Sequence, residues 1–259
     1  MISDRLTLAS DTALETGKKL LDLFHQGNHR GEIKSDQTLV TIADKIADEF
    51  IRTQIITAFP DDGILSEENS TIFPDTEHTW VVDPLDGTVN FSQGLYYWGV
   101  SIAHLKNGKP INAAVYFPMV DELYTASLGY GAQLNGKPLM LSGTPEKSLF
   151  PIFVHCSRMN QRYHNHTPYK TRSLGAAAYH LCLIAKSSAV LALESTPKIW
   201  DFAAGWLIIE EAGGVIRTLG NQQPFPAEPG EDYLNRPFII LAAESEDILS
   251  DAQKTLILR

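Results

Sequence analysis

Two carboxylates lie three positions apart where an apolar run, WVV at 80–82, gives way to the sequence DPLDGT. The proline and glycine that accompany Asp83 and Asp86 favour a tight turn. Hard cations such as Mg²⁺ prefer oxygen ligands in near-octahedral geometry, so a rigid strand-to-turn junction can present both carboxylates and the carbonyl of Leu85 to one centre. The alternative is a plain surface turn, because Asp, Pro and Gly are common turn residues.

Gly87 and Thr88 follow directly, and a short helix could begin there. The exposed backbone N–H groups at such a helix start are suited to binding a phosphate oxygen. The segment therefore combines candidate cation ligands with a candidate phosphate site.

Two further acidic residues favour the cation hypothesis. Glu67 lies upstream in LSEEN at 65–69, and Asp201 lies in IWDFAAG at 199–205. Glu67 could instead be a solvated surface charge. Asp201 is at an expected helix N-terminus, where it could be an N-cap, a cation ligand or both.

Taken together, these segments resemble the inositol monophosphatase family over nearly the whole chain. The resemblance rests on SEE at 66–68, DPLDGT at 83–88, WD at 200–201 and EAGG at 211–214, in that order. It implies an α+β fold, a layered α-β-α-β-α sandwich. It also implies Mg²⁺-dependent, lithium-sensitive hydrolysis of a phosphate monoester, commonly by a homodimer.

The resemblance further implies two or three Mg²⁺ ions in each active site. Their ligands are carboxylates and one carbonyl: Glu67, Asp83 and the Leu85 carbonyl for the first ion, and Asp83, Asp86 and Asp201 for the second. A third, weaker ion would use Glu67 and Asp44. Two ions can activate a water on one side of phosphorus and stabilise the leaving oxygen on the other, without a phosphoenzyme.

The catalytic residues implied by the resemblance are Asp44, Thr88 and Glu67. Asp44 ends the sequence TIAD at 41–44 and matches the aspartate that works with the threonine at Thr88 to orient and deprotonate water. Helical periodicity alone would make Asp44 only a polar position on a helix.

The substrate-binding residues are also implied by the resemblance, and they fall in both halves of the chain: Gly87, Thr88, Ser157, Gly175, Ala176, Ala177, Glu194 and Asp201. A carboxylate at Glu194 would accept hydrogen bonds from vicinal hydroxyls of a polyol. Its alternative is a solvated glutamate after a strand. Ala176 and Ala177 stand where many family members carry a hydroxyl residue, and Lys198 precedes Ile199, so the exact substrate stays open.

The leading substrate is myo-inositol 1-phosphate, and fructose 1,6-bisphosphate, histidinol phosphate and 3′-phosphoadenosine 5′-phosphate are alternatives within the same fold. A phosphatase of the haloacid dehalogenase type requires two aspartates separated by one residue, which Asp83 and Asp86 do not match. A non-catalytic cation-binding module is the alternative from a different class. Thr88 argues against it, because such a module needs no hydroxyl beside a bound water.

The elements that must position these residues alternate along the chain. Apolar spacing predicts helices over 4–25 and 41–58, and β-rich runs over 79–131 predict a largely antiparallel sheet. Beyond a Pro/Gly/Ser-bearing stretch at 142–151, the expected elements are strands and helices in layers: 152–155, 175–187, 189–193, 202–212 and 238–242. We expect one domain, 1–259, with an N-terminal α+β lobe over about 1–142 and a C-terminal α/β lobe over about 150–259.

Composition limits the partners. The 259 residues are 44% apolar and carry a formal charge of −10, from 31 acidic and 21 basic residues. This charge argues against nucleic acid or an anionic membrane, and it makes bound cations the means of neutralising a phosphate. The sequence shows neither a membrane-spanning run nor a signal peptide, so we expect a cytoplasmic protein. The resemblance implies a small phosphorylated polyol as its partner.

Several other signals are given structural interpretations. Cys156 and Cys182 lack metal or disulfide spacing and are expected to be ordinary thiols. Four histidines fit no common zinc ligand spacing: His155, His164, His166 and His180. The polar segment 28–40 is a candidate for a loop that closes on substrate binding.

Overall fold

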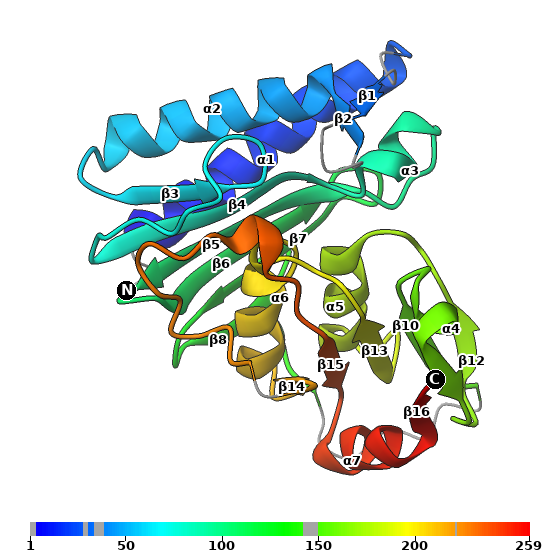
Figure 1. The fold of residues 1–259 in the computed structure, drawn as a ribbon. Helices are drawn as coiled ribbons and strands as arrows, with labels where there is room; N and C mark the ends of the chain where they lie inside the picture. The colour runs from blue at the N-terminus through cyan, green and yellow to red at the C-terminus, as the bar shows by residue number, and fades with distance from the viewer. Residues whose placement is uncertain (1–3, 28–30, 34–38, 142–149, 221) are drawn as a thin grey trace.

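The computed structural model describes residues 4–27, 31–33, 39–141, 150–220 and 222–259. These residues form five layers in the order α-β-α-β-α (Figure 1), which confirms the expected α+β sandwich. Much of the candidate closing segment 28–40, and most of the stretch at 142–151, fall outside the described residues.

The first layer consists of helices α1 (Asp4–His25) and α2 (Ile42–Ala58), which lie across one face of the larger sheet (Figure 1). Each helix has an apolar stripe at helical spacing, and that stripe is buried against the sheet. A short antiparallel hairpin, β1 (Gly31–Ile33) and β2 (Leu39–Thr41), leads directly into α2.

The second layer is a seven-stranded sheet in the order β3-β4-β5-β6-β7-β8-β9. Strand β3 (Gly63–Ser66) runs parallel to β4 (His78–Asp86), and the other pairs are antiparallel. The remaining strands are β5 (Gly99–Lys106), β6 (Lys109–Phe117), β7 (Glu122–Ser127), β8 (Gly131–Leu134) and β9 (Lys137–Leu139). This arrangement confirms the predicted antiparallel character of 79–131.

The middle layer contains α5 (Ala177–Ala185) and α6 (Ile199–Glu211), with the short α3 (Thr88–Ser92) beyond the end of β4. Helix α6 is apolar almost all round and packs against strands of both sheets. A helix of this composition is expected where it is covered on both sides. Figure 1 shows α5 and α6 between the two sheets.

The second sheet has five strands in the order β12-β10-β13-β15-β14. Their bounds are β12 (Lys170–Arg172), β10 (Ile152–His155), β13 (Leu191–Glu194), β15 (Ile240–Ala243) and β14 (Val215–Thr218). Strands β10 and β13 are parallel, so the segments that follow them leave the same edge of the sheet.

Helix α7 (Glu246–Thr255) forms the last layer and packs against β13 and β15. The smaller elements are α4 (Met159–Arg162), the antiparallel pair β11 (Tyr163–Asn165) and β16 (Leu256–Leu258), and a 3₁₀ turn at Tyr233–Asn235. Within the described residues, no helix combines the length and apolar character needed to cross a bilayer.

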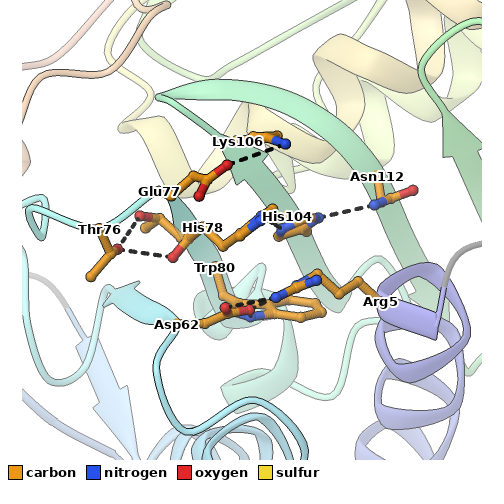
Figure 2. Close-up of polar contacts among 10 residues, drawn as sticks. Arg5, Asp62, Thr76, Glu77, His78, Trp80, His104, Lys106 and Asn112 are labelled. Atoms are coloured by element: carbon orange, nitrogen blue, oxygen red, sulfur yellow. Dashed lines mark hydrogen bonds and ion pairs between the residues drawn. The ribbon is translucent and has the colours of Figure 1, made fainter.

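A polar cluster stabilises one side of the larger sheet, where α1 meets β4 (Figure 2). Arg5 donates from Nε and Nη2 to the two oxygens of Asp62, at 2.9 Å each. The indole N–H of Trp80 donates to Oδ2 of Asp62 at 2.9 Å. Asp62 therefore links α1, the turn before β3 and strand β4.

Figure 2 also shows a chain of hydrogen bonds across the sheet through two histidines. The amide Nδ2 of Asn112 lies 2.9 Å from Nδ1 of His104, whose Nε2 lies 3.0 Å from Nδ1 of His78. Because Nδ2 can only donate, Nδ1 of His104 accepts, and its Nε2–H donates to His78. Both rings are thereby fixed in the neutral form.

Candidate active site

The end of β4 places two carboxylates in the interior. The register of β4 with β5 shifts between Asp83 and Asp86, so a bulge separates them. Within the bulge, the N–H of Leu85 donates to Oδ1 of Asp83 at 3.1 Å. Gly87 follows at φ +86°, where a Cβ would lie 2.7 Å from the carbonyl oxygen of Tyr97. Only glycine fits this close turn, and α3 begins at the next residue.

Three carboxylates from distant segments meet at this point. Glu67 follows β3, Asp83 lies in β4 and Asp201 lies in the first turn of α6. One oxygen from each residue lies within 4.8 Å of the others. This is the only group of three or more potential metal-binding side chains among the residues that the structure describes. Oxygen ligands at this spacing suit a hard divalent cation.

Asp86 lies beside this group and is held by the start of α5. Its two carboxylate oxygens accept from the backbone N–H groups of Ala177 and Ala178, at 3.0 Å each. Burial, and after it the charge of Glu194, raise the pKa of Asp86 to about 7 against the lowering effect of these N–H groups. These two hydrogen bonds fix the orientation of the Asp86 carboxylate, and its oxygens keep lone pairs that could bind a cation.

The N-cap expectation for Asp201 is wrong. Helix α6 begins at Ile199 with Lys198 as its N-cap, so Asp201 is the third helical residue. Its Oδ2 accepts from the backbone N–H of Lys198 at 2.8 Å, which is the reciprocal half of a capping box. Burial and then the charge of Asp86 raise the pKa of Asp201 to about 8.

The buried carboxylates destabilise one another's charged forms. Burial raises the pKa of Asp83 well above its usual value, and the charges of Glu67, Asp86 and Asp201 add to the increase. Such a concentration of negative charge is stable in ionised form only with a compensating cation. The donor set, all oxygen and mostly carboxylate, therefore fits Mg²⁺.

The hydroxyl of Thr88 and the carboxylate of Asp44 form a hydrogen-bonded pair beside the cluster. Thr41 caps α2, and Oδ2 of Asp44 accepts from its backbone N–H and its hydroxyl, at 2.6 Å each. Oγ1 of Thr88 lies 3.0 Å from the remaining oxygen of Asp44 and 3.1 Å from the carbonyl of Leu85. Burial raises the pKa of Asp44, while the hydrogen bonds from Thr41 and Thr88 oppose that increase.

The proposed polyol-binding residues beyond β4 lie at the end of β13, just after β10 and at the start of α5. Glu194 ends β13 and is 4% exposed, so the alternative of a solvated glutamate is wrong. Ser157 is exposed just beyond β10, at the sheet edge from which the segment after β13 also leaves. Ala176 is the buried N-cap of α5, and the N–H of Ala177 is used by Asp86.

The conformation at Gly175 depends on Asn90, which no motif in the sequence marks as a site residue. Gly175 has φ +79°, and a Cβ there would lie 2.9 Å from the amide of Asn90. Nδ2 of Asn90 donates to the carbonyls of Tyr97 and Leu174, at 2.6 Å each. Asn90 thus positions the loop before α5 from the neighbouring α3, and no spacing in the sequence indicates a contact across 84 residues.

Two other positioning residues were missed. The sequence TIAD at 41–44 carries a capping-box signal, which could have identified Thr41 as the partner of Asp44. His180, one of the four histidines whose spacing fits no zinc site, lies fully buried against Glu194. Its role depends on a tertiary contact and has no local signal.

The geometry defines a class of protein: a layered α+β protein with a cluster of carboxylates that could hold a divalent cation, beside a hydroxyl–carboxylate pair. The chain belongs to the inositol monophosphatase family, because the family's sequence model matches residues 2–256. It is a phosphoric monoester hydrolase of this metal-dependent phosphatase family.

Individual relatives carry different names. Over 233 residues the chain is 32% identical to a fructose-1,6-bisphosphatase/inositol-1-monophosphatase of Aquifex aeolicus (strain VF5), covering 85% of this chain and 87% of that one. Over 217 residues it is 35% identical to a histidinol-phosphatase of Chlorobaculum parvum (strain DSM 263 / NCIMB 8327), covering 81% and 83%.

Among solved structures, the extragenic suppressor protein suhB of Bartonella henselae superposes with a TM-score of 0.80. The two chains are 28% identical, and the match covers 98% of each. The names of these relatives leave the substrate of this chain open.

Proposed function

We propose that this protein hydrolyses the phosphate monoester of a small polyol, with myo-inositol 1-phosphate as the leading substrate and inositol and phosphate as the products. The proposal rests mainly on the carboxylate cluster, in which one oxygen each of Glu67, Asp83 and Asp201 lies within 4.8 Å of the others. The hydrogen-bonded pair Thr88–Asp44 lies beside this cluster. A cation-binding module without activity would have no use for that pair.

The proposed ligands are oxygen atoms from both halves of the chain. Glu67, Asp83 and the Leu85 carbonyl would hold one Mg²⁺ ion, and Asp83, Asp86 and Asp201 a second. A third ion would use Glu67 and Asp44. When bound, Mg²⁺ supplies the positive charge that lowers the pKa of a water and offsets the negative charge of the phosphate.

Thr88 and Asp44 would direct the attacking water, with Glu67 assisting. Oγ1 of Thr88 donates to Asp44, at 3.0 Å, and keeps lone pairs that can accept from a water. The water oxygen would form a bond to phosphorus as the ester bond breaks, and a proton of this water would pass by way of Thr88 towards Asp44. The alcohol oxygen would leave with the bonding electron pair and take up a proton from a second water. The raised pKa of Asp44, which burial causes, makes this carboxylate a stronger base.

The polyol would bind on the side of Glu194. Its carboxylate can accept from two neighbouring hydroxyls, and Ser157 can add a hydroxyl contact from the segment after β10. Gly87 and Thr88 would contact the phosphate, with Asp201 near the alcohol. The small side chains of Gly175, Ala176 and Ala177 leave room for a ring.

We further propose that residues 1–259 act as one catalytic unit, since the proposed ligands come from both lobes. A homodimer and lithium sensitivity are part of the same proposal and rest on the family resemblance. A cytoplasmic location is proposed with them.

Phosphate release from a substrate panel tests the proposal. The panel is inositol 1-phosphate, fructose 1,6-bisphosphate, histidinol phosphate and 3′-phosphoadenosine 5′-phosphate, each with Mg²⁺, with EDTA and with added Li⁺. We expect Mg²⁺-dependent release with the highest kcat/KM for inositol 1-phosphate and inhibition by Li⁺. A different preferred substrate would overturn the substrate assignment, and no release from any compound would overturn the activity.

A further inference from the structure

We propose that His180 is a positioning residue, which holds Glu194 as a hydrogen-bond acceptor and restricts its subsite to uncharged hydroxyl groups. The inference rests on the proposed function, because it takes Glu194 to be the polyol-binding carboxylate. His180 itself would contact neither the substrate nor the cations.

His180 and Glu194 form a buried hydrogen-bonded pair. His180 lies on α5 and is completely buried, and Glu194 ends the neighbouring strand β13 and is 4% exposed. Nδ1 of His180 lies 2.5 Å from Oε1 of Glu194. A carboxylate buried to this extent requires a partner, since an unpaired buried charge is strongly destabilising.

The second ring nitrogen determines which atom carries the proton. The backbone N–H of Leu174 points at Nε2 of His180, at 3.0 Å. A backbone N–H can only donate, so Nε2 must be unprotonated and the proton must be on Nδ1. Nδ1–H therefore donates to Glu194, and the neutral ring is fixed in one tautomer.

This tautomer defines what Glu194 can recognise. A carboxylate that receives a hydrogen bond from Nδ1–H stays acceptor-only, with Oε2 left to accept from a substrate hydroxyl. The neutral imidazole supplies no positive charge to offset a second phosphate. The charge of Glu194 also acts on Asp86 and Asp201, whose pKa values it raises, so the subsite adjoins the cation cluster. The class of substrate is thus a monophosphate with neutral vicinal hydroxyls.

His180 also connects this subsite to the cation site through the backbone. The carbonyl of Leu174 accepts from Asn90, and the N–H groups of Ala177 and Ala178 bind Asp86. One short segment, 174–178, therefore contacts His180 at one end and Asp86 at the other. A displaced His180 would release Glu194 and that segment together.

Two substitutions separate the functions of the ring. In His180→Asn, the amide N–H lies near the place of Nδ1, but no acceptor lies near the place of Nε2. In His180→Gln, the amide oxygen can accept near the place of Nε2, but no N–H lies near the place of Nδ1. The experiment compares kcat and KM of the wild type, His180→Asn and His180→Gln, with Mg²⁺, for inositol 1-phosphate and for phenyl phosphate, which lacks neighbouring hydroxyls. The quantity of interest is the ratio of kcat/KM for the two substrates.

We expect His180→Gln to lower this ratio at least tenfold, mainly by raising KM for inositol 1-phosphate. His180→Asn should keep it within about threefold of the wild type, because the donor to Glu194 remains. In a Glu194→Gln background, His180→Gln should change the ratio by less than twofold, since both residues act through one contact. Equal losses for both substrates, or additive effects in the double variant, would overturn the positioning role.

Glu194→Gln alone separates the two proposals. If Glu194→Gln has the same ratio of kcat/KM values as the wild type, the proposed polyol site itself is contradicted. A ratio that falls in Glu194→Gln but not in His180→Gln would contradict only the role of His180.

The tautomer can be tested in the unsubstituted protein, so the inference does not depend on how well the variants fold. Nitrogen-15 NMR of the histidine side chains should show His180 protonated at Nδ1 and unprotonated at Nε2 at neutral pH. Protonation at Nε2, or at both nitrogens, would overturn the assignment.

Discussion

At the scale of single residues, the candidate site is a set of carboxylates whose charged forms are destabilised by burial and by mutual repulsion. Burial raises the pKa of Asp86 to about 7 and that of Asp201 to about 8, against an ordinary value of 3.8 for each. The folded, metal-free protein therefore retains protons that the unfolded chain has already lost above about pH 4.

The metal-free protein should become less stable as pH rises. A carboxylate whose pKa is higher in the folded protein than in the unfolded chain contributes stability that is fully present below about pH 4. This stability is lost as the pH rises from there through the folded pKa values near 7 and 8. Thermal unfolding of EDTA-treated protein at pH 5 and pH 8, with and without added Mg²⁺, measures this effect. The stabilisation by Mg²⁺ should be larger at pH 8. An equal effect at both pH values would contradict the electrostatic account.

Asp83→Asn and Asp201→Asn should each abolish turnover, by roughly 10³-fold or more, while the protein remains folded. Each change removes a proposed ligand charge and also relieves repulsion. We therefore expect the metal-free variants to unfold at a higher temperature than the metal-free wild type, with little further increase on adding Mg²⁺. Asp247→Asn, at an exposed position in the first turn of α7, is the matched control and should behave as the wild type does. Retained activity in both site variants at saturating Mg²⁺ would remove the ligand assignment.

Thr88→Ala should lower kcat by roughly 10²-fold with a smaller effect on KM, because the hydroxyl acts on the water. Thr88→Ser keeps a hydroxyl that can reach Asp44 and should retain most of the activity. Steady-state kinetics at saturating Mg²⁺ gives both values. A Thr88→Ala enzyme with unchanged kcat would show that the hydroxyl is dispensable.

At the scale of elements, local sequence patterns predict most of the helices and strands around the candidate site. They predict fewer of the contacts between those elements. The apolar stripe of 4–25 predicts α1, and the turn chemistry of DPLDGT predicts the start of a helix after β4, which α3 provides. The start of α6 was predicted three residues too late, because the cap is Lys198, a residue type with no N-cap preference.

The contacts around the proposed polyol-binding site join residues that are distant in the sequence. His180 and Glu194 lie 14 residues apart on a helix and a strand, and Asn90 reaches Leu174 across 84 residues. Neither periodicity nor turn chemistry carries information about such pairs. These contacts appear only when the two sheets are stacked on the middle helices.

The histidine chain in the larger sheet makes a separate element-scale prediction. Burial, then the positive charge of Arg5, lowers the pKa of His104 from 6.5 to about 3. Because the unfolded chain takes up this proton at about pH 6.5 and the folded protein does not, stability should fall as pH drops from 6.5 towards 3, by up to about 1.4 kcal/mol per pH unit.

Urea unfolding of the wild type and His104→Gln at pH 7.0, 5.5 and 4.5 tests this prediction. The variant should be less stable at pH 7.0, since it alters a buried hydrogen-bond chain, but its free energy of unfolding should fall less steeply with acid. Parallel pH dependences for the two proteins would show that His104 titrates normally.

At the scale of the whole molecule, the site exists because the chain crosses between two sheets. Glu67, Asp83 and Asp86 come from the larger sheet and its loops, whereas Asp201 lies in the first turn of a middle helix and Glu194 ends a strand of the smaller sheet. The family resemblance predicts a role for each of these residues, although only Glu67, Asp83, Asp86 and Asp201 lie in the short motifs that carry it and Glu194 does not. The helix–strand packing that buries them, and so makes their charges depend on a cation, required the fold.

Phosphate release by EDTA-treated protein, before and after Mg²⁺ is restored, tests the central claim most directly. With inositol 1-phosphate as the substrate, we predict no release above the uncatalysed rate in EDTA and full recovery when Mg²⁺ exceeds the chelator. Release in EDTA at the rate seen with Mg²⁺ would contradict a cation-dependent mechanism at this carboxylate cluster.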